Sequence, residues 1–131
     1  MASSHLACYA VEPFFTEKLS DHLSAIENQV AQCLKWALYT HLKKDQYSGL
    51  HKFRESDLFK GGSPGDMPEV YTLYRRSCDY HTLWYAGGLA DQPDILMREF
   101  DACRAGENQY HNDHEPFLRK MDAEGRTNGT R

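Results

Sequence analysis

The sequence predicts an all-α fold: a small bundle of about four to five helices, with one long helix near the N-terminus. The segment from Phe14 to Lys44 contains neither glycine nor proline, and its apolar residues recur at helical spacing. No window shows the alternation of apolar and polar residues that marks a half-buried strand. Glycine and proline then divide the remaining chain into segments of helical length.

The long helix is predicted to begin at Pro13, because a proline in the first helical turn has no hydrogen bond to lose. Its apolar residues lie at alternating steps of four and three: Leu19, Leu23, Ile26, Val30, Cys33 and Ala37. This stripe fits a helix that packs antiparallel in a bundle, or against a second copy of the chain. We therefore expect Leu19, Leu23, Ile26 and Val30 to form a core or dimer seam.

The length of this helix favours a homodimer. At about 1.5 Å per residue it would be on the order of 45 Å long. A compact domain of this size is only roughly 36 Å across. The helix would therefore overhang its own domain, and a two-fold related copy is the commonest way to cover the excess apolar stripe.

Shorter helices are expected after Ser48-Gly49, which ends the long helix. Leu50, Phe53, Leu58 and Phe59 predict a short second helix, which the glycine-rich loop 61–65 stops. Asp66 is placed to cap the third helix, with Pro68 in its first turn, and this helix should run to about Ala86.

Two more helices complete the predicted bundle. Asp91 and Pro93 open the fourth, and Gly106 is expected to close it. A final short helix includes Phe117, Leu118 and Met121. Residues 1–122 should therefore form a single helical domain. The polar residues 123–131 should form a disordered tail.

Composition and charge exclude two classes of partner. The net charge is -4 and the isoelectric point is near 5.9, so the chain lacks the basic face that nucleic-acid binding needs. No apolar run approaches the roughly 20 residues that span a bilayer. The first residues also lack a cationic stretch followed by an apolar one. We therefore expect a cytoplasmic protein that binds neither nucleic acid nor membrane.

Four aromatic residues are the predicted contacts with a partner protein: Trp36, Tyr39, Tyr71 and Tyr80. Trp36 and Tyr39 point away from the apolar stripe on a helical projection. Tyr71 and Tyr80 flank the apolar face of the third helix. Large aromatic side chains are costly to leave in water and are enriched at interfaces. The alternative is that other helices of the same chain cover them.

The chain carries no motif of a known catalytic mechanism. A nucleophile elbow is absent, and no Lys-Ser or Lys-Thr pair follows the glycine-rich loop as in a P-loop. We expect a non-enzymatic protein without a cofactor. The alternative is a zinc-binding domain or small enzyme centred on two pairs at helical spacing, Cys78 with His81 and His111 with His114. Four nitrogen and sulfur ligands would complete a tetrahedral zinc site.

The long helix from Phe14 to Lys44 and the aromatic stretch from Tyr71 to Tyr85 together resemble the scheme of small bacterial antiactivators. These all-α proteins sequester a transcription factor, as do the antiactivators of the LasR quorum-sensing regulator in Pseudomonas. The resemblance implies a regulatory role in which exposed helix faces occupy the regulator's own dimerisation surface. It is a likeness of architecture and carries no family residues onto particular positions.

Overall fold

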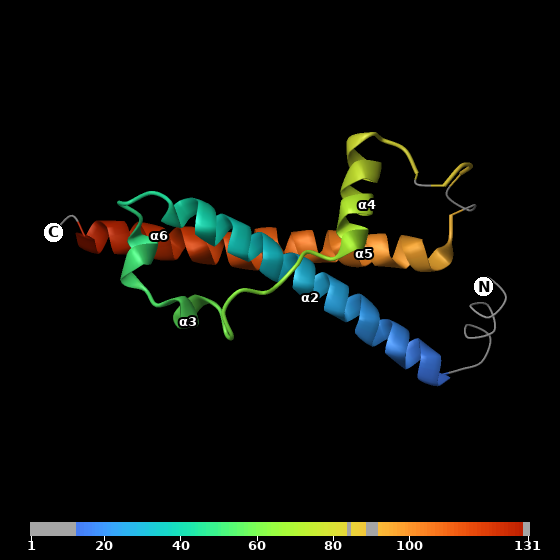
Figure 1. Cartoon of the computed structure of the whole chain (residues 1–131), viewed down its shortest axis with the longest axis horizontal. Helices are drawn as coiled ribbons and strands as arrows, with labels where there is room; N and C mark the ends of the chain where they lie inside the picture. The colour runs from blue at the N-terminus through green and yellow to red at the C-terminus, as the bar shows by residue number, and fades with distance from the viewer. Residues whose placement is uncertain (1–12, 84, 89–91, 130–131) are drawn as a thin grey trace.

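The computed structural model describes residues 13–83, 85–88 and 92–129. Within these ranges the chain forms helices, turns and loops but no strand, which confirms the all-α prediction (Figure 1). The elements, in chain order, are α2 (Pro13–Lys43), η1 (Gly49–Lys52), α3 (Glu55–Leu58), α4 (Glu69–Asp79), α5 (Asp94–Gln109), η3 (Tyr110–His114) and α6 (Glu115–Gly129). The predicted second helix is thus two short pieces, η1 and α3.

Two long rods make up most of the molecule, and they run in the same direction (Figure 1). One is α2, and the other is the uninterrupted series α5, η3 and α6. His22 near the start of α2 bonds Glu99 near the start of α5, at 2.8 Å. Val30, further along α2, meets Gly106 further along α5. The antiparallel packing predicted within a bundle is therefore wrong, because the segment 44–93 returns the chain to the end where α2 began.

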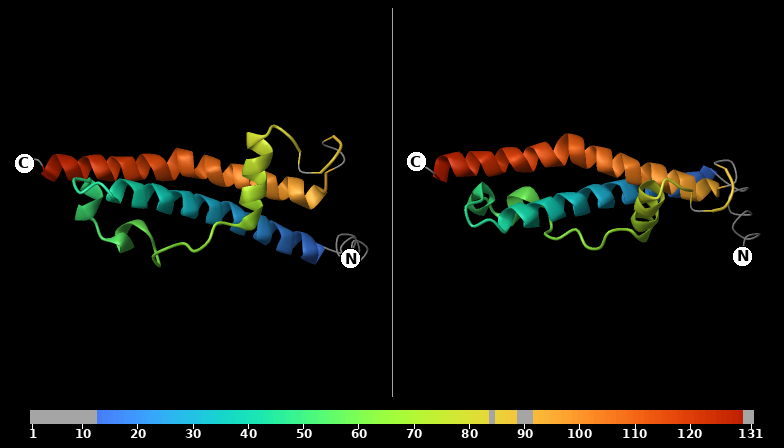
Figure 2. Two further views of the ribbon diagram at one scale, coloured as in Figure 1. Left: turned by 45° about the horizontal axis from the view of Figure 1, so that its top comes forward. Right: turned by 90° about the horizontal axis from the view of Figure 1, so that it is seen from above.

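A π-helical segment, η3, joins α5 to α6. The N–H of Glu115 donates to the carbonyl of Tyr110, five residues earlier rather than four. Pro116 supplies the cause, since it has no N–H and its ring would collide with the carbonyl of Asn112 in a regular α-helix. Figure 2 shows the rod bending near this junction. The chain therefore passes Pro116 without ending the helix.

Gly106 does not close a helix, as the sequence predicted, but lies inside the rod. A Cβ on Gly106 would stand 2.6 Å from the carbonyl oxygen of Glu27 and 2.9 Å from the Cβ of Val30. The backbones of α2 and α5 therefore touch at this point. The glycine is needed for close approach of two helices and not for a turn.

Two apolar clusters form the core between and beside the rods. The first lies where α2 and α6 meet η1 and α3, and consists of Leu38, Tyr39, Leu50, Leu58, Phe59, Tyr110 and Leu118. The second lies where α4 crosses α2 and α5, and consists of Ile26, Val30, Tyr74, Phe100, Ala102 and Cys103. Ile26 and Val30 are thus core residues of the single chain. Leu19 and Leu23 are only half-buried.

The buried stripe of α2 is rotated from the predicted one in the second half of the helix. Ala37, expected in the core, is exposed, whereas Leu38 and Tyr39 are buried. At about 100° per residue, Leu38 lies about 80° around a straight helix from Val30, so the buried face turns along α2. The second half of α2 is covered by η1, α3 and α6, whose residues pack with Leu38 and Tyr39 in the first apolar cluster.

Helix α4 is shorter than predicted at both ends. It starts after Pro68, and no side chain caps its first turn, so Asp66 is not its cap. It ends at Asp79 instead of near Ala86. The N–H of His81 donates to the carbonyl of Cys78, and the N–H of Thr82 to that of Ser77. This is a Schellman turn, with His81 in the left-handed position (φ 55°) that glycine usually takes.

The far end of α6 also departs from expectation. The residues from Ala123 onward were predicted to be disordered, but the helix continues to Gly129. Gly125 within it is buried. Contact with η1 accounts for this order, because Asp122 accepts hydrogen bonds from Ser48 Oγ and the N–H of Gly49. A polar sequence is helical here because tertiary contacts hold it.

Candidate partner-binding surface

Helix α4 crosses the two rods steeply, and its C-terminal end stands away from them (Figures 1 and 2). Val70, Leu73 and Tyr74 on its inner face pack in the second apolar cluster. Figure 1 shows the end of α4 and the chain that follows it projecting to one side of the α5 rod. We call the described part of this projection, residues 76–83 and 85–88, the α4 arm.

The base of the α4 arm is fixed to α5 by one carboxylate. Glu107 accepts hydrogen bonds from the hydroxyl of Tyr71 at 2.7 Å and from that of Tyr74 at 3.2 Å. It also pairs with Arg75 at 3.2 Å. Burial raises the pKa of Tyr74 to about 12, and the charge of Glu107 acts in the same direction. Both tyrosines therefore stay protonated and can donate to Glu107.

The first turn of the arm presents Tyr80. The two backbone bonds of the Schellman turn close this segment, and the hydroxyl of Ser77 donates to the carbonyl of Thr82. The backbone around Tyr80 is thus held by hydrogen bonds, while its side chain is 75% exposed. A large aromatic side chain that is exposed to water on an ordered backbone is typical of residues that contact another protein.

Gln92 holds the later part of the arm. Its side-chain amide accepts from the N–H of Tyr85 at 2.9 Å and donates to the carbonyl of Tyr85 at 2.8 Å. It donates also to the carbonyl of Gly88 at 3.1 Å. Gln92 itself is buried, whereas the side chain of Tyr85 is 52% exposed. The arm therefore carries a second exposed tyrosine on a braced backbone.

A cleft of about 590 Å³ lies between α4 and α5 beside the arm. Its volume falls in the range of about 300–1,000 Å³ that is usual for binding pockets. It combines apolar side chains with charged and polar ones, and its lining residues are Tyr74, Ser77, Cys78, Gln92, Asp94, Met97, Phe100, Asp101 and Arg104. This combination suits an apolar side chain flanked by polar groups.

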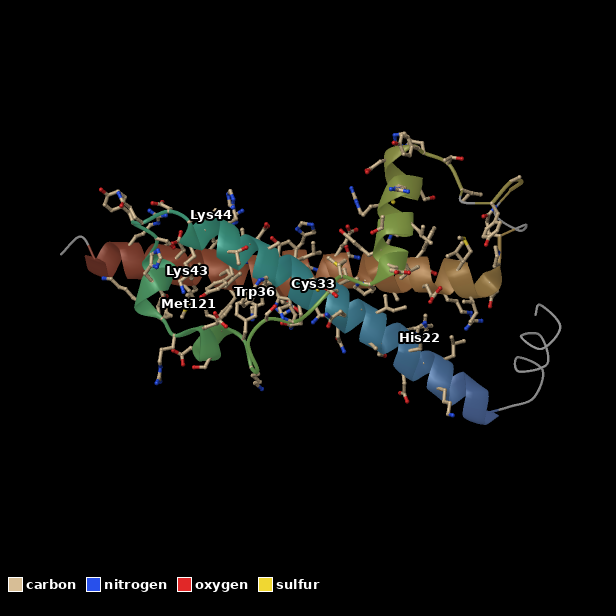
Figure 3. All side chains as sticks on the ribbon, in the orientation of Figure 1. His22, Cys33, Trp36, Lys43, Lys44 and Met121 are labelled. Carbon is tan, nitrogen blue, oxygen red and sulfur yellow. The ribbon has the colours of Figure 1, made fainter. Side chains whose placement is uncertain are left out.

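The structure separates the four predicted contact residues. Tyr80 is exposed, and Tyr71 is half-buried with its hydroxyl engaged by Glu107. Trp36 is half-buried, and its ring centroid lies 5.4 Å from that of Tyr39 and 5.0 Å from that of Phe59 (Figure 3). Tyr39 is only 2% exposed. Tyr39 is therefore a core residue and cannot contact a partner directly.

The zinc-binding alternative does not assemble. Cys78 lines the α4–α5 cleft, and His81 lies in the turn beyond it. His111 is exposed and pairs with Glu115 at 3.8 Å, whereas burial lowers the pKa of His114. Within the described ranges no three His, Cys, Asp or Glu side chains come together to hold a metal ion. The two predicted ligand pairs therefore do not form one site.

Sequence reasoning missed Tyr85, Gln92 and most of the cleft. Tyr85 was counted as part of a helix that in fact ends earlier, at Asp79. The role of Gln92 cannot be predicted from the sequence, because it depends on backbone atoms that the loop brings to its side chain. Its place just before Pro93, at the start of α5, was the only available signal.

None of the helices in the described part of the chain is both long enough and apolar enough to cross a membrane. No family model, no curated protein and no solved structure matches this chain.

Proposed function

We propose that this protein is a non-enzymatic regulator that binds another protein through the α4 arm and the adjoining cleft. The observation that carries the proposal is Tyr80, which is 75% exposed on a hydrogen-bonded turn. Tyr85 repeats this arrangement on the backbone that Gln92 holds. Tyrosine has few rotatable bonds, and an ordered backbone has little freedom left to lose on association. Such residues are common binding hot spots.

The cleft supplies the complementary part of the surface. Met97 and Phe100 offer apolar contact to an inserted side chain, and methionine adapts to irregular shapes. Asp101 and Arg104 at the same cleft offer both signs of charge for orientation. An apolar centre with a polar rim is the usual anatomy of a protein interface. The arm and the cleft therefore form one candidate contact surface.

The resemblance to the LasR antiactivators supports a transcription regulator as the partner. In this proposal the chain acts in the cytoplasm, and the arm occupies the surface through which the regulator dimerises. The chain itself acts as a homodimer. A groove of about 440 Å³ between α2 and α5, lined by the half-buried Leu19 and Leu23 and by Ala102 and Ala105, supports this part of the proposal.

The test mixes the full chain with a purified, dimeric quorum-sensing transcription regulator and measures the mass of the complex by light scattering. The chain is expected to split the regulator dimer into a mixed complex. Replacing both Tyr80 and Tyr85 by serine should weaken complex formation at least about thirtyfold, since a single hot-spot residue contributes about 2 kcal/mol or more. The matched control is Tyr47→Ser. Tyr47 is as exposed as Tyr80, at 74%, but it lies beyond the C-terminal end of α2 and outside the α4 arm.

Two outcomes would contradict the proposal. If the double variant binds like the unchanged chain, the α4 arm is not the contact surface. If the regulator stays dimeric at any ratio, the proposed mechanism is wrong. The mass of the chain alone tests self-association separately. A measured mass of 15.1 kDa, that of one chain, would contradict the proposed homodimer but would not bear on binding through the α4 arm.

A further inference from the structure

Lys35, in the middle of α2, is a buried cation. Its side chain is almost wholly enclosed, since the residue is only 8% exposed. The ammonium donates a hydrogen bond of 2.5 Å to the carbonyl of Leu58. It lies 4.7 Å from the ring centroid of Phe59 and 5.4 Å from that of Phe117. A backbone carbonyl and two aromatic rings thus lie around it. His114 is also near, because the charge of Lys35 adds to burial in lowering the pKa of His114.

Among the described residues, no carboxylate forms an ion pair with this ammonium. Across the described residues, the ion pairs with N···O distances up to 4.0 Å do not include Lys35. Asp57, a carboxylate that lines the same cleft as Lys35, accepts instead from the N–H of Arg54. Burial lowers the pKa of Lys35, as expected for an ammonium without a counter-charge. An unpaired buried charge is costly, and folded proteins rarely keep one without a use.

Lys35 also lines a cleft of about 610 Å³ between α2, the segment 56–64 and α6. The three groups around its ammonium, from Leu58, Phe59 and Phe117, line the same cleft. The ammonium therefore lies at the cleft wall. An ammonium has three donor hydrogens. Within the described part of the chain, Lys35 Nζ uses one of them, in its hydrogen bond to the carbonyl of Leu58. Phe117 is itself partly exposed.

We propose that this cleft binds a small organic acid, with its carboxylate at Lys35 Nζ and its apolar part against the ring of Phe117. The carboxylate supplies the missing counter-charge, and charge-assisted hydrogen bonds are among the strongest in proteins. Gln32, Ser63 and Lys60 line the cleft and offer further polar contacts. The aromatic rings favour an acid with an apolar body over inorganic phosphate. This site is separate from the α4 arm and goes beyond the proposed function.

The experiment measures the thermal unfolding of the full chain at neutral pH with benzoate, acetate or inorganic phosphate, each against chloride at equal ionic strength. Benzoate should raise Tm in a saturable way, because a ligand that binds only the folded state stabilises it. Acetate should act more weakly, since it cannot cover the Phe117 ring. Phosphate should act no differently from chloride.

Two variants and a control make the test specific. Lys35→Met should abolish the benzoate response and leave the Tm without ligand unchanged or higher, because an apolar replacement removes an unpaired buried charge. Phe117→Ala should weaken benzoate more than acetate. Lys44→Met is the control, since Lys44 is exposed just beyond the end of α2 (Figure 3) and its loss should leave the benzoate response intact.

Several results overturn the proposal. A benzoate response that persists in Lys35→Met, or no response in the unchanged chain, removes Lys35 as a ligand-binding residue. A Lys35-dependent response to phosphate but not to carboxylates removes the organic acid. If Lys35→Met fails to fold, Lys35 is structural, and an equal response of Phe117→Ala and the unchanged chain to benzoate then rejects the cleft. None of these outcomes bears on the binding role proposed for the α4 arm, because binding through Tyr80 and Tyr85 is measured in a separate experiment.

Discussion

Gly125 in α6 lies directly against Gly49 in η1: a Cβ built on Gly125 would be 2.2 Å from the carbonyl oxygen of Gly49. The reverse substitution meets the same obstacle, because a Cβ on Gly49 would be 2.0 Å from the carbonyl oxygen of Asp122. The last turns of α6 can therefore rest on η1 only because neither contact position carries a side chain. The order of the C-terminal helix depends on this pair.

Gly125→Ala should destabilise the protein by about 1–3 kcal/mol or more, although alanine is the better helix former. The contacted atoms belong to the backbone and cannot rotate away, so α6 must shift as a whole. Denaturant unfolding followed by circular dichroism measures the change. Glu124→Ala, at the exposed neighbouring position, is the control and should stay within about 0.5 kcal/mol of the unchanged chain. Equal stability of both variants would show that α6 does not rest on η1.

Asp122 should make part of the stability sensitive to acid. Burial raises the pKa of this carboxyl, but hydrogen bonds from Ser48 and Arg126 outweigh it, and the pKa is lowered from 3.8. A lowered pKa means that stability is present above pH 3.8 and is lost as the pH falls through the folded value. Asp122→Asn should be less stable at neutral pH, because its NH₂ group would face the guanidinium of Arg126. It should also lose less stability on acidification.

To test the role of Asp122, the free energy of unfolding is measured as a function of pH for the unchanged chain and for Asp122→Asn. Asp45 pairs with the same arginine at 2.6 Å, and its own pKa is lowered by the hydrogen bond from Arg126. Some acid sensitivity therefore remains in Asp122→Asn. Parallel curves for the two proteins below neutral pH would contradict the role assigned to Asp122.

The hydrogen bonds from Tyr71 and Tyr74 to Glu107, which fix α4 to α5, should be lost at alkaline pH. Burial raises the pKa of Tyr74 to about 12 from an ordinary value of 10, and the charge of Glu107 adds to it. Burial also raises the pKa of Tyr71, with the hydrogen bond to Glu107 adding to it. A raised folded pKa gives stability that is complete below pH 10 and declines as the pH rises toward 12. Unfolding free energy should therefore fall across this interval.

Glu107→Gln provides the direct measurement, by tyrosinate absorbance during an alkaline titration. The variant removes the negative charge beside both hydroxyls, so their titration should move to lower pH. Glu124→Gln, on exposed α6 surface, should leave the titration unchanged. A Glu107→Gln titration identical to that of the unchanged chain would mean that burial alone sets these pKa values.

The sequence was sufficient for features that depend on local pattern. The absence of glycine and proline after Phe14 predicts the long helix, and α2 indeed covers Pro13–Lys43. Ile26 and Val30 are buried as expected, because the apolar spacing of that half is helical. Features that depend on distant partners were not predictable. Gly106 has the same local signature whether it ends a helix or lets Val30 approach, and only the fold decides between them.

The candidate sites show the same division. Tyr80 could be singled out because an aromatic at the edge of an apolar face is visible in sequence. Gln92 could not, since its three bonds depend on the path of the preceding loop. The Lys35 cleft could not either, because Leu58 and Phe117 reach the ammonium from α3 and α6. In the sequence, Lys35 looks like an ordinary charged residue of a helix, because the elements that bury it are distant in the chain.

The left-handed conformation of His81 gives the last prediction. Its φ of 55° is the only positive value among the non-glycine residues that the structure describes. This conformation costs roughly 1–2 kcal/mol for a residue with a Cβ, whereas glycine adopts it freely but loses more entropy on folding. His81→Gly should therefore stabilise the protein by about 0.5–1 kcal/mol, measured by denaturant unfolding.

Two companion variants show whether the turn itself is responsible. His81→Val should destabilise by more than about 1 kcal/mol, because a β-branched residue is the least tolerant of positive φ. Thr82→Gly, one residue further along, should not stabilise, since Thr82 is not left-handed. If His81→Gly proves as destabilising as Thr82→Gly, the left-handed conformation of His81 is not strained and the prediction is wrong. The stabilised variant should also keep Tyr80 exposed on an ordered backbone, so binding through the α4 arm should be at least as strong as in the unchanged chain.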